Sequence, residues 1–320
     1  MKTQILGAAG VGVAVEHLRA GDVVALPTET VYGLAANALE PSAALKIFEA
    51  KERPRFDPLI VHLPDLEWLE RLTSVPSADE KLLAHLTEKF WPGPLTMVLP
   101  RKLLVPDVVT AGLETVALRM SAHPLFRETI AAFGGPLAAP SANRFGRISP
   151  TAAAHVFSEL GGRIPLIIDG GPTTHGLEST IVAVRNRGME ILRHGPVTEE
   201  ILREFGDVRV ASARDLLEAP GQLRSHYAPR TKLILVDELA SFSAPAGRIG
   251  ALSLRPNERQ DFTETRALST SGDLREAAAN LFRCLRELDE AKLDLIVAEE
   301  IPKEGLGVAI MDRLRRASTR

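Results

Sequence analysis

Short apolar runs alternate along this chain with longer stretches in which apolar residues recur every three or four positions. Leu82, Leu83, Leu86 and Phe90 share one helical face after a capping-box pattern at 77–80, which predicts an amphipathic helix. The apolar runs predict strands at 23–26, 59–63, 96–99, 116–119, 166–169, 180–184 and 190–193. Strands that alternate with helices predict an α/β fold.

The pattern changes between residues 206 and 230, where EAPGQLRSHYAPRT shows no regular period and carries His226 and Tyr227. Beyond it, TKLILVDE, IGALSL and LDLIVAEE predict buried strands, with an amphipathic helix over 274–288. We therefore predict a first domain at 1–206, a linker at 207–230 and a small doubly wound α/β domain at 231–320.

Composition limits the class of protein. The chain has 320 residues, of which 45% are hydrophobic and 25% charged, so it can form a full core and is not disordered overall. A net charge of -3 disfavours binding of nucleic acid through bulk charge, although a local basic site remains possible.

The cysteine count and the lack of a membrane span or a clear signal peptide in the sequence predict a cytoplasmic location. Cys284 is the single cysteine, so it cannot form an intrachain disulfide, and its helical context predicts a core position. No apolar run reaches the length of a membrane span. Residues 5–15 have a signal-peptide-like core, but the same residues fit a helix that ends before the first strand.

Several common catalytic motifs are missing from the sequence. GxxxxGK[ST] does not occur, so a P-loop ATPase is disfavoured, and the absence of GxSxG weakens the hydrolase interpretation. Eight histidines without HxxxH spacing and one cysteine predict no protein metal site.

Polar residues cluster instead in loops beside the predicted strands. PTETVYGL follows a buried strand, and KERPRFDPLIVH places cations before a strand that ends at His62. SAN and GRISPT precede a helix, GLEST enters a strand and RHGP leaves one. Each has a simpler reading as a turn, a helix cap or a helix-dipole partner, so each alone is weak evidence for a ligand site.

In this order, the motifs resemble the threonylcarbamoyl-AMP synthase family, which is built on a YrdC-like domain. PGQLRSHYAP and GLGVAIMDRL are similar to the longer family form, so the resemblance covers nearly the whole chain. It implies a twisted mixed sheet followed by a smaller Rossmann-like C-terminal domain. Ala183, His194 and Ser225 depart from the family pattern.

The resemblance implies an ATP-dependent nucleotidyltransferase. It would condense L-threonine, bicarbonate or CO2, and ATP into L-threonylcarbamoyladenylate and pyrophosphate, for N6-threonylcarbamoyladenosine modification of tRNA. Mg²⁺ would enter with ATP, and the proteins that transfer the product to tRNA would be partners, with weak or indirect binding of tRNA itself.

The resemblance also implies the site residues. For threonine it implies Thr30, His62, Arg119, the backbone at Ala139, and Ser179. For ATP it implies Lys51, Arg53, Asp57, Thr115, Ser141, Asn143, Ser149, Arg193 and His226. Asp57 would need a cation or a water between it and the triphosphate, because two anions repel.

Two other functions fit the same motifs less well. An RNA-binding protein could use the same basic cavity, but only 5% of the residues are aromatic, which leaves little for base stacking. Transfer of a carbamoyl group to another acceptor is the second alternative.

Overall fold

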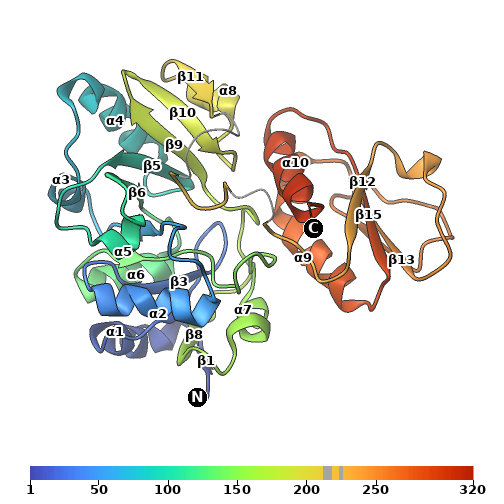
Figure 1. Cartoon of the computed structure of the whole chain (residues 1–320), viewed down its shortest axis with the longest axis horizontal. Helices are drawn as coiled ribbons and strands as arrows, with labels where there is room; N and C mark the ends of the chain where they lie inside the picture. Colours follow the sequence, from blue (N-terminus) through green and yellow to red (C-terminus); the bar gives the residue numbers. More distant parts are fainter. Residues whose placement is uncertain (212–217, 223–225, 320) are drawn as a thin grey trace. The chain divides into compact units, whose positions relative to one another are not determined.

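The computed structural model describes residues 1–211, 218–222 and 226–319, and it confirms the predicted α/β class (Figure 1). The chain forms two compact units. Unit 1 contains Met1–Phe145, Pro150–Thr173 and Glu178–Gln222, and unit 2 contains Gly146–Ser149, Thr174–Leu177 and Leu223–Arg320. The linker predicted at 207–230 includes residues 212–217 and 223–225, which lie outside the described part of the chain, as does Ser225.

Unit 1 is built on a mixed sheet of eleven strands in the order β1-β8-β2-β3-β7-β4-β6-β5-β9-β10-β11. The strands are β1 Gln4–Leu6, β2 Val24–Leu26, β3 Gly33–Asn37, β4 Ile60–His62, β5 Leu95–Pro100, β6 Thr115–Arg119, β7 Leu137–Ala138, β8 Leu166–Ile168, β9 Thr180–Arg185, β10 Gly188–Arg193 and β11 Val208–Val210.

The helices of unit 1 alternate with these strands along the chain. They are α1 Val11–Arg19, α2 Pro41–Lys51, α3 Glu67–Leu72, α4 Ser77–Phe90, α5 Asp107–Thr110, α6 Pro124–Phe133, α7 Ala153–Leu160 and α8 Glu199–Arg203, with a 3-10 turn η1 at Ala8–Gly10. The helix predicted after residues 77–80 is confirmed as α4. Its capping box is not, because Pro76 occupies the N-cap position and Ser77 is already helical.

All seven strands predicted in this part of the chain form, whereas β1, β3, β7 and β11 were not expected, and β1 overlaps the start of the segment 5–15 that was expected to fit a helix. The alternative interpretation of PTETVYGL was a simple turn. In the structure this segment leads from β2 into β3, and the two strands pair antiparallel. The small residues of β3, GLAAN, have weak strand propensity and show no alternation, because four of the five are buried. This hairpin brings the PTET loop back to the sheet.

The two faces of the sheet have different covers, and strand alternation assigns each residue to one of them. Val61, Met97, Leu118 and Val182 point into the main core, against α2, α3, α4 and α7. The residues that alternate with these along each strand point to the other face of the sheet. On one half of that face, α1 and α6 pack against β2, β3, β7 and β8.

The other half of that face, formed by β4, β6, β5, β9 and β10, carries a small apolar cluster to which no helix contributes among the residues that the structure describes. Its members are Ile60, Val98, Ala117, Ile181, Ala183, Leu192 and Ala219, with Ala211 packed against them. Among the described residues outside the strands, Ala219 belongs to this cluster and Ala211 packs against it. We call this surface the open half-face.

Unit 2 contains a parallel sheet of four strands in the order β12-β15-β13-β14. Its elements are β12 Leu233–Val236, η2 Leu239–Ser241, β13 Ile249–Ser253, β14 Glu264–Ala267, α9 Leu274–Glu290, β15 Leu295–Glu299 and α10 Leu306–Ala317. The parallel sheet agrees with the expected small α/β domain. Cys284 is buried on α9, as its helical context predicted, and burial raises the pKa of its thiol.

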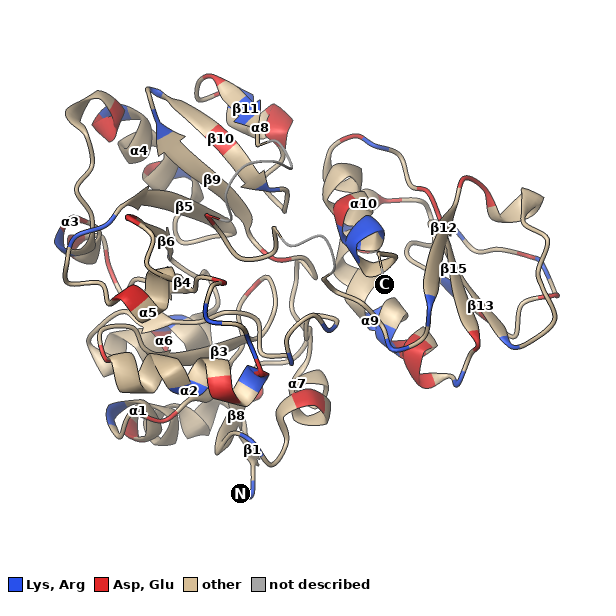
Figure 2. Ribbon diagram, viewed as in Figure 1, with Lys and Arg blue, Asp and Glu red and all other residues tan. Residues whose placement is uncertain are grey.

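Charged residues of both signs are interspersed over both units (Figure 2). Among the residues that the structure describes, no helix is both long enough and apolar enough to cross a membrane.

The division of the sheet into two faces predicts the effect of one core substitution. Leu118→Ala should lower the free energy of unfolding by about 2–5 kcal/mol, because Leu118 is fully buried in the main core. Leu103→Ala is the control, since Leu103 is 97% exposed and should change stability by about 0.5 kcal/mol or less. Urea unfolding measures both, and equal stabilities would contradict the assignment of Leu118 to the core.

Candidate functional site

Polar residues meet where neighbouring strands of the open half-face end. His62 closes β4 and Arg119 closes β6, and the two are register partners on parallel strands. β5 runs antiparallel to β6, and β9 runs parallel to β5, so Thr96 and Ser179 lie at the same edge. Arg193 ends β10 at that edge too, because β10 is antiparallel to β9. The sheet therefore gathers residues that are far apart in the sequence.

A buried ion pair organises this edge. The Arg119 guanidinium lies 2.7 Å from Glu29 Oε1, and it also donates to the carbonyl of Gly93 at 3.2 Å. Ser121 Oγ donates to Glu29 Oε2 at 2.5 Å. Burial would raise the pKa of Glu29, but Arg119 and Ser121 lower it to about 2. Glu29 is therefore ionised at neutral pH, and it holds Arg119 in one orientation.

His62 lies beside this pair as a neutral side chain. Burial, followed by the charge of Arg119, lowers the pKa of His62 to about 3. Its ring packs against Phe126 with centroids 4.6 Å apart, and Nδ1 has no hydrogen-bond partner within the described part of the chain. A buried polar atom without a partner is costly, so Nδ1 is suited to a ligand that supplies one.

The PTET loop brings hydroxyl groups to the same edge. Thr30 follows Glu29 in the sequence, is fully buried, and shares a 2.8 Å hydrogen bond between its Oγ1 and that of Thr28. The Thr28 hydroxyl donates to the carbonyl of Val31 at 2.6 Å, which closes the turn. Ala139 follows β7, and its N–H donates to the Ile60 carbonyl at 2.8 Å. Only the carbonyl of Ala139 is left by that bond for a ligand.

Ser179 joins two strands through its hydroxyl group. Its Oγ lies 2.7 Å from Thr96 Oγ1 and accepts from Arg193 at 3.1 Å. Arg193 also donates to the Ser179 carbonyl through Nε at 3.1 Å and through a terminal nitrogen at 3.0 Å. Arg193 was expected among the ATP residues, and the structure places it against Ser179, a residue expected for threonine.

A second group of expected residues gathers around the C-terminus of α2. Lys51 is 1% exposed, and its ammonium donates to the carbonyls of Ser141 and, at 2.5 Å, of Asn143. Burial, followed by the charge of Arg53, lowers the pKa of Lys51 well below its usual value. A bound anion at this position would restore the charged form.

Arg53 and Asp57 form a buried pair in the loop that follows α2. The guanidinium lies 2.9 Å from Asp57 Oδ2 and donates to the main-chain carbonyls of Asp57 and Pro58 at 3.1 and 2.8 Å. Burial raises the pKa of the Asp57 carboxyl, although Arg53, Lys51 and Arg193 act in the opposite direction. The influence of Arg193 on Asp57 links this group to the Ser179 edge.

Thr115 begins β6, four residues before Arg119, so the two side chains stand on one face about 13 Å apart at Cα. Extending the pairing of Ile60 with Ala117 places Thr115 opposite Pro58, beside the Arg53–Asp57 pair. The open half-face therefore has polar groups at both ends and apolar residues between them. An elongated ligand pair could lie along it.

The remaining two expected residues belong to unit 2. Ser149 is fully buried and His226 is 6% exposed. The His226 and Tyr227 rings lie 4.1 Å apart.

A short segment, Glu218–Gln222, packs on the open half-face within unit 1. Ala219 is buried in the apolar cluster, the Pro220 carbonyl accepts from Arg193 at 3.3 Å, and Glu218 accepts from Arg185 at 3.0 Å. This segment lies in the predicted linker at 207–230.

Sequence reasoning missed Glu29, Ser121 and Thr96, which orient Arg119 and Ser179. Glu29 lay inside the quoted PTET motif, and a lone carboxylate after a buried strand was the signal that could have identified it. Ser121 and Thr96 had no signal, because only the sheet register brings them near. Tyr32 lies in PTETVYGL, and its hydroxyl donates to the Gly171 carbonyl at 2.8 Å, which indicates a structural role.

The residues present are compatible with Mg²⁺ that arrives on a nucleotide. No cluster of three or more His, Cys, Asp or Glu side chains that could hold a metal ion occurs among the described residues. Mg²⁺ bound to substrate phosphates needs only one or two protein carboxylates, and Asp57 stands next to the cations of the second group.

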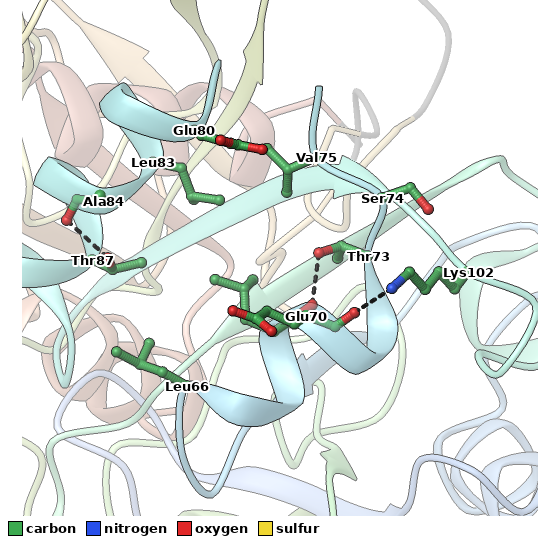
Figure 3. Close-up of a pocket in the computed structure, with 11 residues that line it drawn as sticks. Leu66, Glu70, Thr73, Ser74, Val75, Glu80, Leu83, Ala84, Thr87 and Lys102 are labelled. Carbon is green, nitrogen blue, oxygen red and sulfur yellow. Dashed lines mark hydrogen bonds between the residues drawn. The ribbon is translucent and has the colours of Figure 1, made fainter. Parts of the chain in front are cut away.

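A pocket of about 580 Å³ lies between α3, α4 and Lys102 (Figure 3). Leu69 and Leu83 line it, and the Lys102 ammonium donates to the Glu70 carbonyl at 2.6 Å. Both helices cover the main core, so this pocket is on the opposite face of the sheet from His62 and Arg119.

Comparison with known families agrees with this arrangement. A family model described as "Telomere recombination", which spans Sua5, YciO and YrdC proteins, matches residues 16–195. A second, described as "Threonylcarbamoyl-AMP synthase, C-terminal domain", matches residues 197–319.

Relatives match over almost the whole chain. A threonylcarbamoyl-AMP synthase of Pyrococcus abyssi is 41% identical, over 96% of this chain and 93% of the relative. One of Bacillus subtilis is 42% identical, over 94% and 90%. The crystal structure of P. abyssi Sua5 complexed with L-threonine is 39% identical, covers 99% of this chain and 98% of that chain, and has a TM-score of 0.91.

The low pKa of His62 predicts a pH dependence of stability. The unfolded chain takes up a proton at this side chain near pH 6.5, whereas the folded protein does so only near pH 3. Acidification between these values favours the unfolded state, by up to about 1.4 kcal/mol per pH unit from this group. In His62→Asn, the free energy of unfolding should therefore fall less steeply with decreasing pH.

The control is His85→Asn, which replaces an exposed histidine of α4 and should keep the wild-type slope. Denaturant titrations at several pH values measure the slopes. The same slope in His62→Asn and in the wild type would show that His62 is not held neutral by burial.

Proposed function

Since this chain belongs to the threonylcarbamoyl-AMP synthase family, it is an ATP-using enzyme of tRNA modification, and we propose that its open half-face holds both substrates. The observation that carries the proposal is the set of buried cations in unit 1. Lys51, Arg53 and Arg119 are each less than 9% exposed. Such groups match a reaction in which anionic substrates must be brought together.

We assign the edge around Arg119 to L-threonine. The guanidinium of Arg119, held by Glu29, is suited to the substrate carboxylate, and His62 Nδ1 offers a neutral hydrogen-bonding group. Thr30, Ser179 and the Ala139 carbonyl supply the polar groups for the ammonium and hydroxyl. The P. abyssi relative whose structure contains L-threonine supports this substrate.

We assign the second group to ATP. Lys51 and Arg53 face the phosphates, together with the Ser141 and Asn143 segment that Lys51 fixes. Thr115, Asp57 and Arg193 complete the part of this site in unit 1. Ser149 and His226 of unit 2 are included because they match the family's motifs.

The reaction needs positioning and charge more than a protein nucleophile. Bicarbonate or CO2 carboxylates the threonine amine, and a carboxylate oxygen of this product then forms a bond to the α-phosphorus of ATP. The bond from the α-phosphorus to the bridging oxygen breaks, and pyrophosphate leaves with the electron pair. Two anions have to approach, so fixed cations at Lys51, Arg53 and Arg193 lower the barrier by stabilising the developing charge.

Mg²⁺, when bound with ATP, would neutralise part of the triphosphate charge. Asp57 is the carboxylate we assign to it. Arg53 holds Asp57 in place, and a cation between Asp57 and the phosphates removes the repulsion that direct contact would cause.

We further propose domains at 1–206 and 231–320 joined by a linker that covers the site. The contacts of Ala219 and Pro220 with the open half-face support this part of the cover. The product would pass to proteins that transfer the threonylcarbamoyl group to tRNA, so this chain need not bind tRNA tightly. A role in tRNA modification favours a cytoplasmic location.

Mass spectrometry tests the proposed function directly. Purified protein incubated with ATP, Mg²⁺, L-threonine and bicarbonate should yield threonylcarbamoyladenylate and pyrophosphate. Reactions that lack threonine or bicarbonate are the controls. ATP consumption without the adenylate, or an adenylate formed without bicarbonate, would reject the assignment.

Lys51→Ala and Arg53→Ala should each reduce adenylate formation. Charge-assisted contacts contribute about 1.5–3 kcal/mol, so we expect about a ten- to hundredfold loss in kcat/KM for ATP. Arg55→Ala is the matched control, because Arg55 is exposed in the same segment and should retain activity. Initial rates of pyrophosphate release measure the effect. Full activity in both Lys51 and Arg53 variants would remove these residues from the ATP site.

The threonine pocket should discriminate between related amino acids. Valine lacks the hydroxyl, so it would leave buried polar groups without partners and should react at least about a hundredfold more slowly. Serine lacks only the methyl group and should lose about tenfold. Rates at matched, subsaturating concentrations give this ranking. Equal rates for threonine, serine and valine would contradict a pocket built from Thr30, His62 and Ser179.

A further inference from the structure

One stripe of α9 contacts three separate segments of unit 2. Ala278, Phe282 and Arg286 are spaced four residues apart, so their side chains line one face of the helix, and all three are buried. Each position meets a different part of the chain. Two of those parts, Gly146–Ser149 and Thr174–Leu177, are short insertions from the sequence of unit 1.

Arg286 holds the first insertion. Its guanidinium donates to the carbonyl of Ile148 at 2.9 Å, and it is 8% exposed. The other end of the insertion is held by the linker, because Ala228 N–H donates to the Gly146 carbonyl at 2.9 Å. The residue that follows Ile148 is Ser149. The carbonyl contact therefore fixes the backbone directly before a residue assigned to ATP.

The second insertion approaches the helix backbone at Gly176. A Cβ atom at this position would lie 2.5 Å from the Ala278 carbonyl and from Ala279 Cα, and φ is +67°. Only glycine fits there without displacing main chain. Gly176 opens the GLEST motif, and Ser179 comes three residues later. The close approach thus positions the start of a second segment that leads to a substrate residue.

The middle of the stripe holds the linker. The rings of Phe282 and Tyr227 stack with centroids 5.6 Å apart, and the Arg313 guanidinium lies 5.3 Å from the centroid of Tyr227. Tyr227 adopts φ of +62°, which is uncommon for a residue with a side chain. A backbone held in this conformation requires surrounding contacts that determine it, and Phe282 and Arg313 supply them.

We propose that the α9 stripe positions the loop of unit 2 that carries Ser149, a residue assigned to ATP, with Arg286 as the positioning residue. The inference rests on the proposed function, because it assigns to unit 2 a part in ATP binding. Arg286 acts through the Ile148 carbonyl and does not itself touch substrate. Losing its hydrogen bond should loosen the loop and affect ATP more than threonine.

The test compares three variants in the full-length protein. Arg286→Ala should raise KM for ATP about tenfold or more, while KM for threonine changes less than about twofold, because Thr30, His62 and Arg119 belong to unit 1. Arg286→Lys keeps a donor and should recover part of the loss. Arg283→Ala is the matched control, since Arg283 is exposed one turn earlier on α9 and pairs with Glu287.

Hydrogen exchange provides a readout that does not depend on activity. Peptides that cover residues 145–149 should exchange faster in Arg286→Ala than in the wild type and in Arg283→Ala, with α9 itself unchanged. Unaltered exchange in this loop together with an unaltered KM for ATP would overturn the proposal. Faster exchange throughout α9 with equal losses for both substrates would also overturn it, because that pattern indicates general destabilisation.

If Arg286→Ala does not fold, Arg286→Lys and Arg286→Gln are compared with the wild type in its place. Residues 145–149 should then exchange faster in the glutamine variant than in the lysine variant. Equal loop exchange and equal KM for ATP in those two variants and the wild type would reject the role of Arg286. If the wild-type protein forms no adenylate, the proposed function fails, whereas the loop-exchange result still decides whether Arg286 anchors the loop.

Discussion

Buried cationic side chains need polar partners at fixed positions, and the arrangement of unit 1 depends on how this requirement is met. Lys51, Arg53, Arg119 and Arg193 are all largely removed from solvent, which would be strongly unfavourable without hydrogen bonds. Main-chain carbonyls provide much of the compensation: those of Asn143, Pro58, Gly93 and Ser179 each accept from one of these cations. Carbonyl partners orient a cation without cancelling its charge. The cations therefore remain able to attract an anionic substrate, which fixed carboxylate partners at every position would prevent.

The sheet supplies the geometry that this requires. Alternation along β4, β6, β5 and β9 sends one set of side chains into the main core and the other set to the open half-face. The first set is apolar and provides the rigidity, whereas the second includes His62, Arg119 and Thr115 at the strand ends. Because parallel and antiparallel neighbours have a fixed register, residues at the ends of five strands meet at one edge. The loops then add Glu29, which pairs with Arg119, and the segment Glu218–Gln222, whose Ala219 packs on the open half-face.

Much of the fold follows from local patterns, and much of the site does not. Apolar runs located seven strands of unit 1, but β1, β7 and β11 have only two or three residues each and β3 consists mostly of small residues, so their patterns were too weak to predict them. The capping-box pattern at 77–80 was misleading because Pro76 already fixes an extended backbone at the N-cap position. Motif resemblance predicted site roles for His62, Arg119 and Lys51. It could not reveal the Glu29–Arg119 pair or the Thr96–Ser179 hydrogen bond, since both depend on sheet register. The hydrogen bond from Arg286 on α9 to the Ile148 carbonyl likewise joins residues 138 positions apart in the sequence.

We propose that both substrates lie on the open half-face, with threonine at the Arg119 edge and the phosphates near Lys51 and Arg53. A crystal structure of this protein with L-threonine and a non-hydrolysable ATP analogue tests it most directly. We expect the threonine carboxylate at Arg119, the other polar groups of threonine within hydrogen-bond distance of His62 and Ser179, and the triphosphate against Lys51 and Arg53. Density for either ligand in the pocket between α3 and α4, or a triphosphate distant from Lys51 and Arg53, would contradict it.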